Sequence, residues 1–238
     1  SNKPGTPFAD IRVRKAIAHA INEDEIIEKV MRGQATATAQ VPDPPTVGYM
    51  PGLQRLPYDP ALAKKLLAEA GFPDGFAITV AGPNDRYVND EKICEAVAKY
   101  LSKIGLKVNL DAKPKSIFFD ELSDFKHRFY LIGWFDGSFD FGRSAEKLLH
   151  TPDKDRGMGA YNGAIYSDPE LDKMIIESSS IIDRSERQKA LQAINQKSVE
   201  DVAWIPLHYQ QDIYAVVKDA GVVFTPRPDQ WIVAKEIN

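Results

Sequence analysis

The sequence predicts an α/β fold in which a mostly parallel β-sheet is flanked by helices. Apolar or alternating runs that are typical of strands lie at 76–80, 106–111 and 129–134. Helical repeats separate these runs, and connections of that length join parallel strands through right-handed crossovers. The run 129–134 is unbroken and apolar, so we expect a central strand there that is buried on both faces.

The amino-terminal part begins with two helices and a long crossing segment. Asp10 precedes a helical repeat of apolar residues, and Asn22 with Glu25 forms an Asn-led capping box for a second helix, which Gly33 ends. Residues 34–57 are rich in Ala, Thr, Pro and Gly but too apolar for a free linker. We therefore expect an ordered segment that crosses the molecule.

The central helices carry clear start and stop signals. Asp59 followed by Pro60 begins a helix that Gly71 ends. Asn89 or Asp90 begins the helix that follows the first strand. The remaining expected elements are helices over 116–125 and 143–150, a polar loop over 151–164, helices that begin at Asp168 and Asp183, short strands over 205–209 and 213–217, and an irregular tail from Gly221.

Composition excludes several classes of protein. The chain has 238 residues and a formal net charge of −4, so its charge does not favour nucleic acid or an anionic membrane surface. No run of residues has the apolar length of a membrane span. Cys94 is the single cysteine and is expected to be a small buried residue, so no internal disulfide can form. We expect Ser1 and Asn2 to be a cloning remnant, and the chain to be a fragment.

Three loops should leave the same edge of the predicted sheet. They span 82–88, 112–115 and 133–142, and each follows the carboxyl end of a strand. Ligands of open α/β sheets lie at that edge. The third loop is rich in aromatic residues and carboxylates, so we expect half of a binding cleft here. The candidate ligand-binding residues are Trp134, Asp136, Phe135, Phe139, Arg86 and Tyr87.

Each candidate also has a plain structural interpretation. Asp136 and Asp140 are as well suited to shaping turns, or to capping the next helix, as to ligand contact. They are also the only support for an enzyme hypothesis, in which they act as paired acids or metal ligands. The aromatic residues could simply pack beneath the loop, and a protein-interaction domain remains a third alternative. Motifs for nucleotide binding, serine hydrolysis and zinc proteolysis are absent, and the four histidines lack ligand spacing, so we expect no catalytic residue, cofactor or metal.

Four segments resemble the bacterial extracellular solute-binding proteins of family 5, the dipeptide, oligopeptide and nickel class. They occur in the order and spacing of that family and cover nearly the whole chain. The segments run from Phe8 to Asn22, from Tyr58 to Phe76, from Asn162 to Ile175 and from Trp204 to Val216.

The resemblance implies a fold and a domain organisation. Residues 3–216 would form the second ligand-binding lobe of a type II periplasmic-binding protein, with a mixed, mostly parallel sheet of about five strands. The amino-terminal lobe would lie outside this sequence, and the tail 217–238 would return to it.

The resemblance also implies a function. The protein would be a non-enzymatic receptor that closes around a solute and delivers it to an ABC permease in the inner membrane. It would be periplasmic or extracellular and membrane-associated through that permease. A peptide is the expected solute, with an oligosaccharide, an opine-like compound or a nickel complex as alternatives. Trp134 matches the family's cleft tryptophan, whereas Gly137 stands where peptide-binding members have an aspartate, and Asp136 lies one residue earlier.

Overall fold

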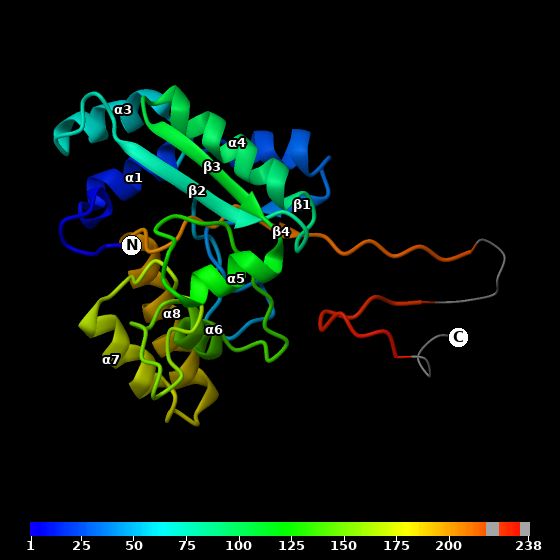
Figure 1. The fold of residues 1–238 in the computed structure, drawn as a ribbon. Coiled ribbons are helices and arrows are strands. Elements are labelled where there is room, and N and C mark those ends of the chain that lie inside the picture. The colour runs from blue at the N-terminus through cyan, green and yellow to red at the C-terminus, as the bar shows by residue number, and fades with distance from the viewer. Residues whose placement is uncertain (218–223, 234–238) are drawn as a thin grey trace.

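The computed structural model describes residues 1–217 and 224–233, and it confirms the predicted α/β class. Helices and strands alternate through the first half of the chain, and helices dominate the second (Figure 1). The elements are η1 (Pro7–Ala9), α1 (Ile11–Ala20), α2 (Glu23–Glu25), η2 (Ile26–Val30), β1 (Ala35–Ala37), α3 (Pro60–Glu69), β2 (Ala77–Pro83), α4 (Asp90–Lys103), β3 (Lys107–Lys113), α5 (Lys115–Ser123), α6 (Phe141–Leu148), α7 (Pro169–Ser178), α8 (Arg184–Glu200) and β4 (His208–Gln210).

The strands form one parallel and one antiparallel pair. β2 and β3 run parallel, in a register that places Ala77 opposite Lys107 and Pro83 opposite Lys113. β1, near the start of the chain, pairs antiparallel with β4, near its end. The described part of the chain therefore has two separate two-stranded sheets, one parallel and one antiparallel, in place of the predicted mixed sheet of about five strands.

The segment 129–134 corrects the prediction of a strand buried on both faces. It runs beside β2 and is joined to it by a single parallel bridge between Ala81 and Tyr130. Ala81 donates its N–H to the carbonyl of Phe129 at 3.2 Å, and Leu131 donates to the carbonyl of Ala81 at 2.8 Å. The side chains from Phe129 to Ile132 are only half-buried, because a cavity of about 1440 Å³ lies against this segment. The segment lies next to β2, as predicted from its apolar run, but its side chains are less buried than predicted.

The carboxy-terminal strands are also shorter than predicted. β4 spans His208–Gln210 and overlaps the expected strand 205–209 only at His208 and Tyr209, and the expected strand 213–217 is absent. Residues 211–217 instead leave the body as an extended chain (Figure 1), in which Ile213 is 71% exposed. Residues 218–223 and 234–238 lie outside the described part of the chain, so the predicted return of the tail 217–238 to another lobe stays a prediction.

Most helix starts agree with the predicted capping residues. The side chains of Asp10, Asn22, Asp59, Asp168 and Asp183 each accept a hydrogen bond from a backbone N–H in the following turn. Such caps satisfy donors that the first helical turn leaves free, which is why local sequence places these helices well.

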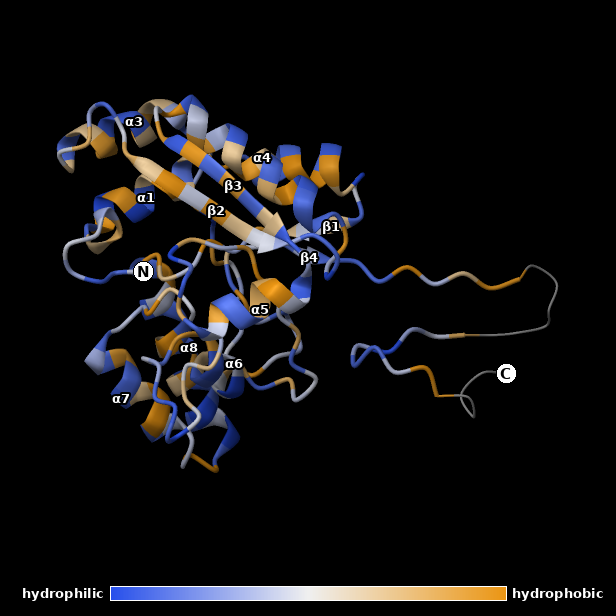
Figure 2. Ribbon diagram, in the orientation of Figure 1, coloured by the Kyte–Doolittle hydropathy of each residue, from blue (hydrophilic) through white to orange (hydrophobic). Residues whose placement is uncertain are grey.

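Two main apolar clusters hold the molecule together. The larger lies between α1, α3, α4 and β2 and includes Ile17, Leu67 and Leu101. The second lies among α6, α7 and α8 and includes Phe141 and Leu191. Figure 2 shows apolar and polar bands alternating along single helices, as expected for helices with one face in a core.

The structure agrees with the expectation for Cys94. Cys94 is fully buried in the larger cluster, as predicted, and burial raises the pKa of its thiol to about 12. Within residues 1–217 and 224–233, no helix combines the length and the apolar character that crossing a membrane requires.

Candidate ligand-binding site

The three predicted loops do converge at one edge of the β2–β3 pair. The Tyr87 hydroxyl, in the loop after β2, donates to the carbonyl of Gly133 at 3.0 Å. The loop after β3 joins the same group, since Lys115 donates its backbone N–H to Asp85 Oδ1 at 2.7 Å. The topology argument from sequence is therefore confirmed, and these contacts define a shared rim formed by residues 84–90, 112–115 and 133–142.

Asp90 fixes the first of these loops. Its side chain is 3% exposed, and its Oδ2 accepts hydrogen bonds from the backbone N–H groups of Arg86 and Tyr87, both at 2.9 Å. Its Oδ1 accepts from Glu91 N–H at 2.9 Å. The predicted helix start is thus correct, but Asp90 ties the loop back onto the helix, whereas Asn89 makes no side-chain cap.

The loop held by Asp90 presents Arg86 and Tyr87 together. The Arg86 guanidinium lies over the Tyr87 ring, 5.1 Å from the ring centroid. Burial raises the pKa of Tyr87, so its hydroxyl stays protonated and donates to Gly133. A Cβ at Gly133 would lie within 2.9 Å of the Tyr87 ring, so the close approach requires glycine there. Arg86 is exposed, and its charge is available at the rim.

Trp134 belongs to an aromatic wall. Its ring packs edge-on against Tyr161, with centroids 5.2 Å apart, and the Phe119 ring also packs edge-on against Tyr161, with centroids 6.5 Å apart. The Trp134 indole N–H donates to Ser144 Oγ at 2.9 Å. Sequence analysis identified Trp134 but missed Tyr161, Phe119 and Ser144, because they come from a polar loop and from two helices, and only tertiary packing brings them together.

Asp136 lies beside Trp134 and shapes the turn that follows it. Its Oδ1 accepts from the backbone N–H of Ser138 at 3.0 Å and from the Ser138 hydroxyl at 2.7 Å. Its Oδ2 accepts a longer hydrogen bond, 3.4 Å, from the Ser144 hydroxyl. The turn-shaping interpretation is therefore correct, and it leaves acceptor capacity on Oδ2 for a further donor.

Asp140 does not join Asp136 as a second acid. Its Oδ1 caps α6 by accepting from Gly142 N–H at 2.9 Å. The Arg187 guanidinium binds both carboxylate oxygens, at 2.5 and 2.7 Å, and this pairing raises the pKa of Arg187. Both oxygens of Asp140 are engaged in structural contacts, which weighs against the enzyme hypothesis built on Asp136 and Asp140.

The two remaining candidates flank the cavity in different ways. Phe135 is 51% exposed at the rim. Phe139 is half-buried with a φ of 52°, and its carbonyl accepts from Val47 N–H at 2.9 Å. Both residues line the cavity of about 1440 Å³, together with Trp134, Asp136, Arg86 and Tyr87. All six predicted residues therefore share one cavity, while their role in ligand binding stays a prediction.

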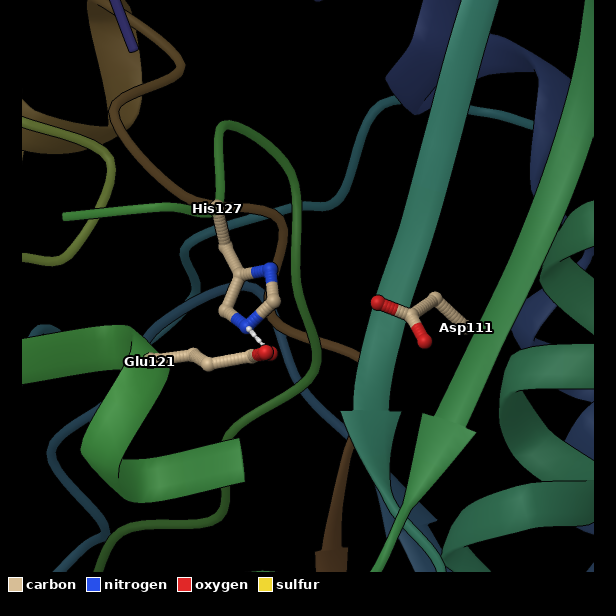
Figure 3. Close-up of side chains that lie close together, drawn as sticks. All are labelled: Asp111, Glu121 and His127. Atoms are coloured by element: carbon tan, nitrogen blue, oxygen red, sulfur yellow. Dashed lines mark ion pairs between the residues drawn. The ribbon is translucent and has the colours of Figure 1, made fainter. Parts of the chain in front are cut away.

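One cluster near the rim has the composition of a metal site. Asp111, Glu121 and His127 offer ligand atoms that all lie within 4.8 Å of one another, and Figure 3 shows the three side chains converging. However, the Lys113 ammonium already bridges the two carboxylates, 2.8 Å from Asp111 and 2.7 Å from Glu121. Burial lowers the pKa of His127, which favours the neutral ring. Lys113, Asp111 and Glu121 form an ion-pair network that joins β3 to α5, and the neutral His127 ring lies beside it.

Comparison with known proteins identifies relatives of this chain. The family model described as bacterial extracellular solute-binding proteins, family 5 Middle, matches residues 1–155. The glutathione-binding protein GsiB of Pectobacterium atrosepticum is 28% identical over 204 residues, which cover 84% of this chain and 39% of that protein. Heme-binding protein A of Haemophilus influenzae is 29% identical over 222 residues, which cover 87% of this chain and 38% of that protein.

A solved structure confirms the type II periplasmic-binding fold. The periplasmic binding protein DppA of Helicobacter pylori, in complex with the peptide STSA, superposes with a TM-score of 0.80 at 24% identity. The match covers 88% of this chain and 40% of DppA. The chain thus spans about two fifths of the length of the relatives that it matches.

Proposed function

Because this chain belongs to the family 5 bacterial extracellular solute-binding proteins, we propose that it is one lobe of a two-lobe receptor that captures a peptide for an ABC importer. The rim formed by the three loops is one wall of the cleft. A second lobe, outside this sequence, supplies the other wall. Solute binding shifts the equilibrium between open and closed forms, and the closed form docks on a permease in the inner membrane from the periplasmic or extracellular side.

The observation that carries this proposal is the shared rim itself. Trp134 and Tyr161 provide an apolar wall beside a carboxylate, Asp136, that retains acceptor capacity. Arg86 lies on the neighbouring loop, which is bonded to Gly133 through Tyr87. Aromatic surface between the carboxylate of Asp136 and the exposed guanidinium of Arg86 suits a peptide, which carries both charges and apolar side chains.

The named relatives support solute capture more strongly than they support one solute. Glutathione, heme and a peptide appear in the names and title of the three relatives described above. Peptide-binding members of the family pair an aspartate with the α-amino group of the peptide, at the position where this chain has Gly137. A peptide is favoured here because Asp136, one residue before Gly137, can take that role. A neutral oligosaccharide has no cationic group for that charge pairing.

Calorimetric titration of the full-length receptor tests the proposal. A peptide set that includes STSA should show binding, while glutathione and heme serve as competing solutes. Asp136→Asn and Trp134→Ala should each weaken peptide binding by about tenfold or more. Asp74→Asn is the matched control, because Asp74 is exposed in the turn before β2, at the opposite end of that strand. Full affinity in Asp136→Asn would overturn the assigned role of Asp136.

The two-lobe arrangement has a test of its own. The 238-residue chain should bind the same peptide at least about a hundredfold more weakly than the full-length receptor, because half of the contacts are absent. Equal affinity of the chain and the receptor would contradict a cleft that two lobes share.

A further inference from the structure

Ser144 lies at the junction of the two principal side chains of the rim. It is in the first turns of α6 and only 4% exposed. Its hydroxyl oxygen accepts from the Trp134 indole N–H at 2.9 Å, and its hydroxyl donates to Asp136 Oδ2, with 3.4 Å between the two oxygens. A serine hydroxyl has one proton, so this geometry defines a direction: indole N–H to hydroxyl, and hydroxyl to carboxylate.

We propose that Ser144 is a positioning residue that couples Trp134 to Asp136, so that the charge of Asp136 strengthens the hydrogen bond of the Trp134 indole N–H. Sequence analysis did not single out Ser144. The link exists whether or not a peptide is the solute, and its consequence for affinity rests on the function proposed above.

The physical basis is a short chain of hydrogen bonds that ends on a charge. A carboxylate acceptor polarises the hydroxyl, and the polarised oxygen becomes a better acceptor for the indole N–H. Packing against Tyr161 limits the other orientations of the ring, so the hydrogen bond to Ser144 selects among few rotamers. Without the hydroxyl, the indole N–H loses its acceptor and the ring loses this constraint.

The arrangement also predicts how a solute would be sensed. Ser138 occupies Oδ1 of Asp136 with two hydrogen bonds, so a cationic group that approaches Asp136 from the cavity meets Oδ2. That is the oxygen to which Ser144 donates. A cation bound at Oδ2 weakens the hydrogen bond from the Ser144 hydroxyl to Asp136. The hydrogen bond from the Trp134 indole to Ser144 then weakens as well, without direct contact between the cation and the indole.

Indole resonances in a proton–nitrogen correlation spectrum of the 238-residue chain provide a readout that needs no solute. The chain has three tryptophans, and Trp134→Phe assigns the resonance of interest. In Ser144→Ala, the Trp134 indole proton should move upfield and exchange with water about five- to tenfold faster. Asp136→Asn should move it in the same direction by less. The indoles of Trp204 and Trp231 are controls within each spectrum.

The double variant decides between coupling and two independent effects. If Ser144 transmits the charge of Asp136, then Asp136→Asn should produce no further shift once Ser144 is alanine. Ser144→Thr, which restores a hydroxyl, should restore most of the shift and the protection from exchange. An equal effect of Asp136→Asn with and without the Ser144 hydroxyl would overturn the proposal.

A second measurement on the full-length receptor tests the functional consequence. For a peptide that binds, Ser144→Ala should weaken affinity about three- to tenfold, and less so in the Asp136→Asn background. If no peptide binds, the proposed function fails while the spectroscopic coupling can still hold. If peptides bind but the Trp134 indole ignores Ser144→Ala, the coupling fails while the proposed function stands.

Discussion

Replacing Asp90 by asparagine should destabilise the protein and loosen the loop that carries Arg86 and Tyr87. The buried carboxylate accepts three backbone N–H groups, each at 2.9 Å. Hydrogen bonds to a charged acceptor contribute about 1.5–3 kcal/mol each, and those to a neutral acceptor about 1 kcal/mol. An asparagine oxygen can keep two of the bonds at reduced strength, but its NH₂ group then faces the N–H of Glu91.

The expected cost is therefore about 2.5–7 kcal/mol of unfolding free energy, from one lost bond and two weakened ones. Urea denaturation followed by far-UV circular dichroism measures it, with the slope of the transition compared between variants. Glu91→Gln is the matched control, since it removes the same charge from the same helix start at an exposed position, and should cost less than about 1 kcal/mol.

The loop itself offers a second readout for Asp90→Asn. Tyr87 should lose its hydrogen bond to Gly133, so backbone amides of residues 84–88 should lose protection from exchange while those of α4 keep it. A cost for Asp90→Asn no greater than that for Glu91→Gln would refute the reasoning, because the three bonds would then contribute nothing beyond the charge.

Three further predictions concern a tight contact, a buried acid and an ion pair. Gly133→Ala should cost about 1–3 kcal/mol in denaturant unfolding, because its Cβ meets the Tyr87 ring, and should cost little in a Tyr87→Ala background; an equal cost in both would exclude the clash. Burial raises the pKa of Glu23 from 4.5 to about 7, so the folded state retains a proton that the unfolded state loses between those values, and stability falls as pH rises through that range. Glu23→Gln should remove this part of the pH dependence and gain about 2–3 kcal/mol above pH 7, whereas a constant difference between the two proteins from pH 4 to 8 would contradict the assignment. Arg187→Leu should cost about 2–3 kcal/mol in thermal or urea unfolding, because it leaves Asp140 partly buried without its bidentate partner, and an unchanged stability would show that the pair contributes nothing net.

Local signals predicted the helices well because capping is a local interaction. Asp59 and Asp168 accept from N–H groups two and three residues away, so a short window of sequence contains both partners. The rim was also predictable, because parallel strands joined by helices must end at one edge. The contact of Tyr87 with Gly133 bears this out.

The strand predicted over 129–134 was wrong for a reason that sequence does not contain. An apolar run states that a segment prefers burial, but the neighbouring element decides how much of it is covered. Here β2 pairs along one edge of the segment. Phe129 and Leu131 pack against the larger cluster, and Tyr130 and Ile132 pack against a small cluster around Phe118. Because the cavity also lies against the segment, these side chains are only half-buried.

The sequence by itself determined the family, the α/β class, the helix starts and the edge at which a site would form, because these depend on short-range periodicity, capping and chain connectivity. Only the tertiary structure decided which side chains complete the rim. Ser144 meets Trp134, Tyr161 packs on the same indole, and Arg187 takes up Asp140 from 47 residues away. Such partners are selected by the packing of distant elements, and no local pattern of residues records that selection.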